Sequence, residues 1–178
     1  MKKILVLSSS PRKCGNTDVL CDAFMEGARE AGHEVAKIRI ADLNIGYCRA
    51  CYACKKLGKC VIQDDAKGVL EKMMAADVIV LATPVYFYSC SAQMKALFDR
   101  SVAIFPRLTN KDYYYIMAQA DSDKAMLAGT IKSLDGFLDC YEGSTVKGMV
   151  CAPGVYEKGE INGTPYMEEA RELGRQVK

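Results

Sequence analysis

Short, strongly apolar segments alternate with segments of helical periodicity along this chain, and this alternation constrains its fold more than any other feature. The apolar segments lie at residues 4–8, 35–40, 78–83, 113–118 and 146–151. Apolar residues at helical spacing follow them, over residues 17–31, 64–74, 89–98, 123–140 and 165–177. This pattern predicts an α/β chain, because right-handed crossover units make the strands parallel and cover both faces of the sheet with helices. In such doubly wound sheets ligands bind beyond the carboxyl ends of the strands, so the loops after the strands are the candidate sites.

The length and charge of the chain narrow the classes of partner. With 178 residues, it is predicted to form a single domain over residues 1–178. Its 24 basic and 22 acidic residues are spread along the sequence, which argues against nucleic acid as a partner. No apolar run approaches the roughly 20 residues of a membrane span, and the run at residues 4–7 is predicted to be a strand and not part of a signal peptide. Nine cysteines without a secretion signal predict a cytoplasmic protein.

The loop between the first strand and the first helix is the first candidate ligand site. It covers residues 8–17, and its backbone N–H groups converge on a helix N-terminus, which attracts anions. Neither GxGxxG nor the Walker pattern is present, so a single phosphate fits better than a dinucleotide or a nucleoside triphosphate. The alternative is a polar turn with an ordinary helix cap. The candidate phosphate-site residues are Ser8, Ser10, Arg12, Gly15, Asn16 and Thr17.

The loop after the third strand is the second candidate site, because three consecutive aromatic residues leave the edge of the sheet there. Aromatic side chains favour contact with a flat ring, and backbone N–H groups of the same turn can bond the edge of that ring. The alternative is that one or two of these aromatic side chains pack inward. The candidate ring-site residues are Thr83, Pro84, Val85, Tyr86, Phe87, Tyr88 and Ser89.

These two loops resemble those of a known family. The tripeptides at residues 10–12 and 15–17 resemble the phosphate loop of NADPH-dependent FMN reductases and iron–sulfur flavoproteins, and residues 82–86 and 91–100 resemble the same family's flavin loop and following helix. The resemblance implies a flavodoxin-like, three-layer fold with five parallel strands in the order 2-1-3-4-5. It also implies NAD(P)H as electron donor and a homodimer or homotetramer. The implied cofactor is FMN, with its phosphate held by Ser10, Arg12, Asn16 and Thr17.

The loop after the fourth strand departs from the family pattern. Residues 118–123 read Ala-Gln-Ala-Asp-Ser-Asp, where a glycine-containing flavin loop is expected. We include Ala120 of this loop as a flavin contact. Asp121 and Asp123 either face the flavin, where they would disfavour an anionic reduced ring, or cap the next helix.

A cysteine-rich loop at residues 48–60 follows the second strand. Its spacing is CxxCxxC followed by a fourth cysteine after five residues, which resembles iron–sulfur flavoproteins and favours a [4Fe-4S] cluster. Zinc is the main alternative metal, and cysteines that hold no metal at all are a further one. Since the second strand neighbours the first in the implied order, we expect the thiols at the flavin edge of the sheet. The candidate ligands are Cys48, Cys51, Cys54 and Cys60.

These features together predict an FMN-dependent oxidoreductase that moves electrons from NAD(P)H, or from a ferredoxin-type donor, to a quinone, a flavin or another acceptor. The cluster would pass single electrons to or from a partner. An iron–sulfur flavoprotein that carries electrons without a substrate of its own is the main alternative, and a flavin-binding regulatory module is the other. No residue is assigned a separate catalytic role. The single histidine, His33, is expected to be structural.

Overall fold

The computed structural model describes all 178 residues, and its centre is a sheet of five parallel strands in the order β2-β1-β3-β4-β5. This order confirms the predicted flavodoxin-like fold. Each strand lies within three residues of the segment predicted from the sequence. The strands are β1 (Lys3–Ser8), β2 (Glu34–Arg39), β3 (Val78–Pro84), β4 (Asp112–Ala118) and β5 (Thr145–Ala152).

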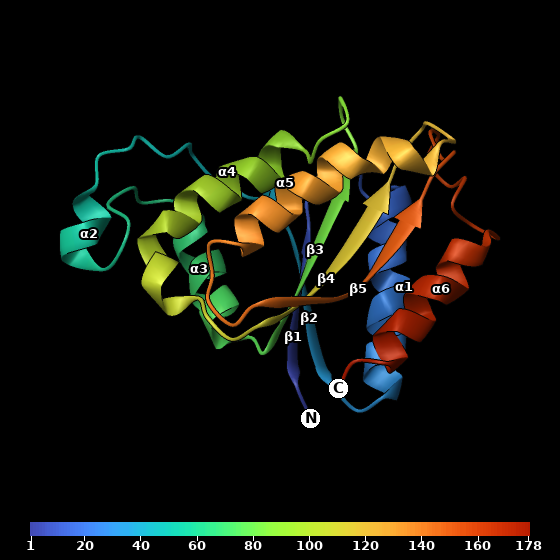
Figure 1. Ribbon diagram of the computed structural model, residues 1–178, viewed down its shortest axis with the longest axis horizontal. Helices are drawn as coiled ribbons and strands as arrows, with labels where there is room; N and C mark the ends of the chain where they lie inside the picture. The colour runs from blue at the N-terminus through green and yellow to red at the C-terminus, as the bar shows by residue number, and fades with distance from the viewer.

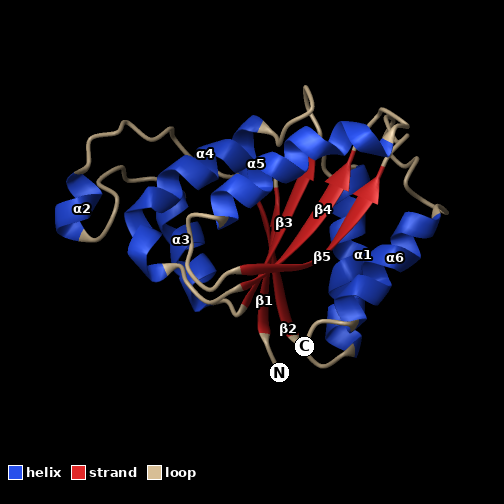
Figure 2. Cartoon of the chain, in the orientation of Figure 1, coloured by secondary structure: helices blue, strands red, loops and turns tan.

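Helices cover both faces of the sheet (Figures 1 and 2). One face carries α1 and α6, and the other carries α3, α4 and α5. The helices are α1 (Asn16–Glu30), α2 (Ala53–Leu57), α3 (Ala66–Ala75), α4 (Ala92–Arg100), α5 (Ala128–Leu138) and α6 (Pro165–Arg175). Three 3₁₀ segments complete the regular structure: η1 (Ile40–Asp42), η2 (Ser101–Arg107) and η3 (Lys124–Leu127). None of the helices combines the length and apolar character that crossing a bilayer requires.

The core is divided by the sheet into two apolar clusters, as strand geometry requires. Along β1, Leu5 and Leu7 point into the cluster beneath α3, α4 and α5, whereas Ile4 and Val6 point into the cluster beneath α1 and α6. All four side chains are almost fully buried. Burial on both faces explains why β1 and β3 are continuous apolar runs, whereas the edge strands β2 and β5 also carry polar residues.

Helices α1 and α6 pack side by side at unusually close range (Figure 1). A β-carbon placed on Gly27 of α1 would lie 1.8 Å from the carbonyl oxygen of Arg171, and one on Gly174 of α6 would lie 2.1 Å from that of Phe24. Both positions therefore require glycine because backbone faces backbone. This contact fixes α1, whose N-terminal end forms part of the candidate site.

Two details of the predicted elements need correction. The helix predicted over residues 123–140 begins as η3 and continues as α5, which ends at Leu138. The cysteine-rich loop contains the short helix α2, which no periodicity in the sequence indicated. His33 is structural as expected, because its Nδ1 accepts from the Lys2 N–H and its Nε2 bonds the Val177 carbonyl.

Candidate functional site

A cavity of about 110 Å³ lies where the loops after β1, β3 and β4 meet, and we call it the edge pocket. It brings together eight of the residues predicted from the sequence: Ser10, Arg12, Asn16, Thr17, Pro84, Val85, Tyr86 and Ala120. Four lining residues were not predicted: Ala118, Gln119, Val155 and Tyr156. Six predicted residues lie outside the lining: Ser8, Gly15, Thr83, Phe87, Tyr88 and Ser89.

The turn at the N-terminus of α1 has the features of an anion site. Gly15 occupies the N-cap position without a side-chain cap, so the first-turn N–H groups of α1 have no side-chain acceptor there. A β-carbon on Gly15 would lie 3.0 Å from the Arg12 carbonyl oxygen and 3.3 Å from Ser10 Oγ, so the turn closes tightly only with glycine. Thr17 is buried and lines the pocket. A phosphate group is the kind of ligand that such a helix end holds.

The side chain of Asn16 already has partners within the protein. Its Nδ2 donates to the Glu157 carbonyl at 2.9 Å, and its Oδ1 accepts from the N–H groups of Gly159 at 3.1 Å and Ile161 at 3.4 Å. Asn16 was expected to contact phosphate with this side chain. In the structure the amide instead joins the segment after β5 to the turn at the N-terminus of α1.

Arg12 is held at the rim of the edge pocket. Its Nη1 donates to the Tyr156 carbonyl at 2.7 Å, and its guanidinium carbon lies 5.7 Å from the centre of the Tyr156 ring. Both residues line the pocket. The contact places a cation beside the turn at the N-terminus of α1. It also holds Tyr156, which lies more than 140 residues away in sequence, at one wall of the pocket.

A buried carboxylate network supports the turn from beneath. Asp18 accepts from Ser8 Oγ and from the Cys14 N–H, both at 3.1 Å, and lies 3.2 Å from Lys37 Nζ and 2.8 Å from Arg39 Nη1. Burial would raise the pKa of Asp18, but Lys37, the Cys14 N–H and Arg39 outweigh it and hold the pKa below its usual value. The predicted phosphate residue Ser8 therefore belongs to this support and does not line the pocket.

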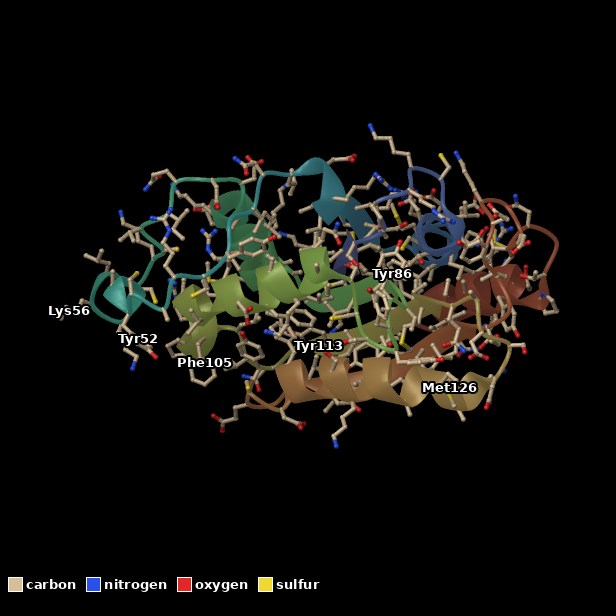
Figure 3. All side chains as sticks on the ribbon, turned by 90° about the horizontal axis from the view of Figure 1, so that it is seen from above. Tyr52, Lys56, Tyr86, Phe105, Tyr113 and Met126 are labelled. Atoms are coloured by element: carbon tan, nitrogen blue, oxygen red, sulfur yellow. The ribbon has the colours of Figure 1, made fainter.

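The aromatic loop forms a tight turn with one side chain at the pocket. Tyr86 and Ser89 exchange two backbone hydrogen bonds of 3.0 Å, and Phe87 and Tyr88 between them have φ of 49° and 58°. Tyr86, labelled in Figure 3, lines the pocket and is 42% exposed, whereas Phe87 is fully exposed and does not line it. Of the three aromatic side chains, only Tyr86 is placed to cover a ring in the pocket.

Thr83 acts within the protein rather than at the pocket surface. Its Oγ1 donates to the Pro84 carbonyl and accepts from the Ser91 N–H, each at 2.9 Å. Ser91 Oγ in turn lies 2.8 Å from Ser9 Oγ and accepts from the Met94 N–H, which makes Ser91 the N-cap of α4. These buried bonds fix the loops after β1 and β3 relative to each other.

Gln119 was not predicted from the sequence; it lines the edge pocket, and its side chain has an unpaired acceptor. Its side chain is buried, its Nε2 donates to the Asp123 carbonyl at 2.7 Å, and its Oε1 has no hydrogen-bond partner. Asp121 and Asp123 cap local N–H groups, including that of Ala125. The expectation of a cap on the next helix is thus confirmed for Asp123, which caps η3, whereas Asp121 accepts from the Asp123 N–H. A buried acceptor without a donor at a cavity is a position suited to a ligand N–H.

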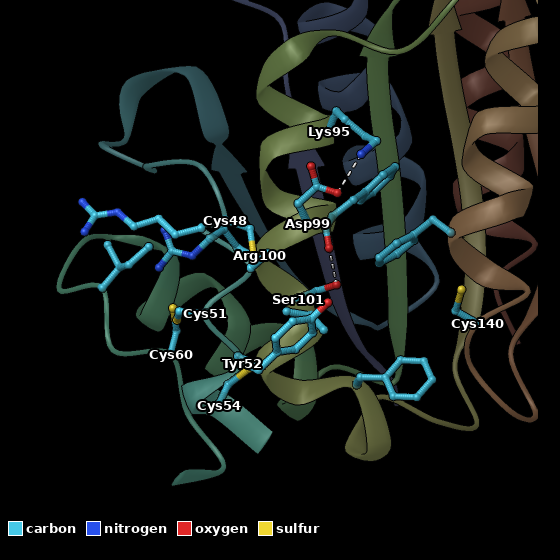
Figure 4. Close-up of a pocket in the computed structure, with 18 of the residues that line it drawn as sticks. Cys48, Cys51, Tyr52, Cys54, Cys60, Lys95, Asp99, Arg100, Ser101 and Cys140 are labelled. Carbon is cyan, nitrogen blue, oxygen red and sulfur yellow. Dashed lines mark hydrogen bonds and ion pairs between the residues drawn. The ribbon is translucent and has the colours of Figure 1, made fainter. Parts of the chain in front are cut away.

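The four cysteines of the cysteine-rich loop border one cavity of about 700 Å³, which we call the cysteine pocket (Figure 4). All nine cysteines are free thiols. No three cysteine, histidine or carboxylate side chains come close enough together to hold a metal ion in this arrangement. Cys48 and Cys51 are exposed, and Cys54 and Cys60 are half-buried. Metal binding would therefore require the thiols to converge from the rim of this pocket.

The cysteine pocket does not lie at the flavin edge of the sheet, so that expectation is wrong. It shares no lining residue with the edge pocket. The loop is anchored beside η2, at the C-terminal end of α4, where Arg107 donates to the Gly58 carbonyl at 2.6 Å. The Tyr86 turn instead precedes the N-terminal end of α4 (Figures 1 and 3), about 14 Å of helix away. The loop leaves β2 at the predicted edge of the sheet. The bond from Arg107 then holds it beside the C-terminal end of α4.

Three observations on the cysteine pocket fit a thiolate-bound cluster. Four thiols border one cavity, which is the donor set that iron–sulfur clusters use. Ala50 and Tyr52, on either side of Cys51, have φ of 50° and 56°, and left-handed residues of this kind turn backbone N–H groups towards an anion. Arg100, also at the pocket, has a buried Nε without a partner. The residues present are therefore compatible with an anionic cluster.

The sequence is similar to one protein family and to several known proteins. A family model described as NADPH-dependent FMN reductase matches residues 2–140. An iron-sulfur flavoprotein from Methanosarcina thermophila is 45% identical over 102 residues, which cover 57% of this chain and 53% of the relative. The chain spans about half the length of the curated relatives it matches.

Solved structures show the same fold at low identity. An NAD(P)H:quinone oxidoreductase from Methanothermobacter marburgensis is 16% identical with a TM-score of 0.76, and the match covers 99% of each chain. An azoreductase from Bacillus anthracis is 17% identical with a TM-score of 0.78, covering 99% of this chain and 100% of that one. The shared fold agrees with the sequence match over residues 2–140. The chain belongs to the NADPH-dependent FMN reductase family.

Proposed function

We propose that the chain binds FMN in the edge pocket and acts as an NAD(P)H-dependent oxidoreductase that reduces a quinone, a flavin or a related acceptor. The observation that carries this proposal is that the anion-binding turn of α1, the Tyr86 turn and the loop after β4 line one cavity. Bound FMN supplies the chemistry, because it accepts a hydride and returns electrons singly or in pairs. The name of the family supports NAD(P)H as donor, and the quinone oxidoreductase and azoreductase of similar fold support the acceptor class.

Different residues of the edge pocket bind different parts of FMN. The first turn of α1 and Arg12 hold the phosphate by charge and by N–H donors. Tyr86 covers one face of the ring, and the Oε1 of Gln119 offers an acceptor for a ring N–H. Val155 and Tyr156 wall the pocket from the segment that Asn16 fastens, which limits the entry of water.

The test of FMN binding is retention of the cofactor with a matched pair of variants. Protein reconstituted with excess FMN is expected to leave a desalting column yellow. Arg12→Met is expected to weaken FMN binding about tenfold or more, because a charge-assisted contact is lost. Lys13→Met removes the neighbouring exposed charge, which does not line the pocket, and is expected to leave binding unchanged. A colourless wild-type eluate would contradict the proposal.

Turnover separates the enzyme from its main alternative. If the protein is an oxidoreductase, FMN-loaded protein oxidises NADPH or NADH when a quinone or free flavin is supplied. An electron carrier without its own substrate would show negligible turnover with nicotinamides but would be reduced by ferredoxin. A bound flavin that exchanges electrons with neither donor would support the third reading, a regulatory module.

We further propose that Cys48, Cys51, Cys54 and Cys60 hold a [4Fe-4S] cluster that passes single electrons. The spacing of the cysteines, their common pocket and the name of the 45% identical relative support it. Iron and acid-labile sulfide near four of each per chain are expected in anaerobically purified protein. Stoichiometric zinc without sulfide would establish the alternative metal.

The assembly and the compartment complete the proposal. We infer a homodimer or homotetramer, since Phe87, fully exposed on the Tyr86 turn, and Phe105, 48% exposed on η2, leave apolar surface uncovered in one subunit. Light scattering on purified protein measures this directly, and a monomer would contradict it. Nine free thiols fit the reducing cytoplasm.

A further inference from the structure

Arg100 is a buried cation at the C-terminal end of α4 whose hydrogen-bonding groups are only partly used by the protein. Its side chain is 1% exposed. Its Nη1 donates to the Gly46 carbonyl at 2.8 Å and to Asp64 Oδ2 at 2.6 Å, and its Nη2 donates to Asp64 Oδ1 at 2.9 Å. Its Nε is buried and has no partner. Leaving a buried N–H unpaired costs free energy, so the position points to a missing acceptor.

The unpaired group belongs to a residue that borders the cysteine pocket together with all four candidate ligands (Figure 4). The hydrogen bonds that Arg100 donates to Asp64 are the largest influence that raises the pKa of the guanidinium, and Cys60 raises it further. Arg100 and Cys60 line the same pocket. The sulfur atoms of the four candidate ligands are the acceptors there that we consider for the unpaired Nε–H.

Asp64 prevents the guanidinium from turning away from the pocket. Besides its two bonds to Arg100, it accepts from the Gly46 N–H at 2.8 Å and from the Ala66 N–H at 3.1 Å. Burial would raise the pKa of Asp64, but Arg100 and these N–H groups hold it below its usual value, so the pair stays ionised. Gly46 precedes the four cysteines in sequence and Asp64 follows them. By binding both residues, Arg100 links the two ends of the cysteine-rich loop.

We propose that Arg100 donates its Nε–H to a sulfur of the cluster on the Cys60 side and thereby raises the reduction potential of that cluster. The inference rests on the cluster proposed above. A thiolate-bound cluster gains one negative charge when it takes up one electron, and much of this charge lies on sulfur. An N–H···S bond is therefore stronger in the reduced state and favours reduction.

The test compares two arginine-to-lysine variants of the anaerobically reconstituted holoprotein. Arg100→Lys keeps the positive charge but loses the planar Nε–H donor. It is expected to shift the one-electron reduction equilibrium about tenfold towards the oxidised cluster, which is about 59 mV in the midpoint measured by EPR-monitored titration. Arg107→Lys is the matched control, because Arg107 anchors the same loop but does not line the pocket. Its midpoint is expected to be unchanged.

A measurement on the wild-type chain covers the case in which Arg100→Lys does not fold. Protein made with ¹⁵N-arginine is expected to show hyperfine coupling between an arginine nitrogen and the reduced cluster in pulsed EPR. The coupling is expected to persist in labelled Arg49→Lys, which removes the other arginine at the pocket. A cluster without this coupling, or with an unchanged midpoint in Arg100→Lys, would overturn the role of Arg100 alone. Wild-type protein without iron and sulfide would overturn the cluster as well.

Discussion

The close backbone contact between α1 and α6 gives a quantitative prediction for Gly174→Ala in α6. The new methyl group would lie 2.1 Å from the Phe24 carbonyl oxygen and 2.9 Å from the Ala28 nitrogen, whereas ordinary contacts begin at 3.4 Å. Both obstacles are backbone atoms, so no side chain can rotate away, and α1 and α6 must separate by about 1 Å. We expect a loss of about 3 kcal/mol in the free energy of unfolding, the upper end for overpacking. This is a large share of the roughly 5–15 kcal/mol that holds such a domain together.

Gly68→Ala in α3 is the matched control for this measurement. It makes the same chemical change inside a helix, but no atom lies within 4 Å of the new methyl group. Alanine is the better helix former, so this variant is expected to gain about 0.5–1 kcal/mol. Urea unfolding of the FMN-free proteins at 25 °C gives both values from the shift in midpoint. If Gly174→Ala is as stable as Gly68→Ala, the backbone contact between α1 and α6 is not present in solution.

Three further variants probe the edge pocket and its support. Asp18→Asn removes a carboxylate that pairs with both Lys37 and Arg39, and it is expected to lower stability at pH 7. Because the folded pKa of Asp18 is depressed, its contribution is present above the unfolded pKa and is lost as pH falls through the folded value, so the urea midpoints of the two proteins should approach each other as the pH is lowered below the usual pKa of a carboxyl group. Gln119→Leu removes the unpaired Oε1 and is expected to weaken FMN binding about tenfold in a fluorescence titration, and equal affinity would contradict its assignment. Gly129→Ala would place a methyl group 2.5 Å from the Tyr88 carbonyl oxygen, so it should displace the Tyr86 turn and raise the Kd for FMN several-fold, whereas an unchanged Kd would show that the turn yields freely.

Much of the fold follows from the sequence, because its strands are buried on both faces and are separated by helices of regular periodicity. The five strands could therefore be predicted from the pattern of apolar and helical segments, and the turn at residues 8–17 from its place between the first strand and the first helix. The strand order followed from the family resemblance, and the structure confirms it. The boundary of α5 was less predictable, because η3 keeps an approximate helical spacing while its hydrogen bonds differ.

The parts of the site that escaped prediction depend on contacts between distant segments. The Asn16 amide bonds Glu157, and no local pattern in either segment signals that pairing. Gln119 is notable only because its Oε1 has no partner once the chain is folded. The course of the cysteine-rich loop is set by Arg100 and Arg107, which lie some 40 residues or more beyond it in sequence. Spacing alone identified the thiols but gave no information on where they would be held.

The bond from Asn16 to the segment after β5 has a consequence for how proteins of this kind diverge. The family match ends at residue 140, yet Val155 and Tyr156, which wall the edge pocket, come after it. Relatives that share residues 2–140 but differ in the segment after β5 would bind the phosphate of the cofactor in the same way. They would present a different pocket wall to the molecule that exchanges electrons with the cofactor. Preference for an acceptor can thus evolve separately from preference for the cofactor, while Asn16 and Arg12 hold the variable segment in place.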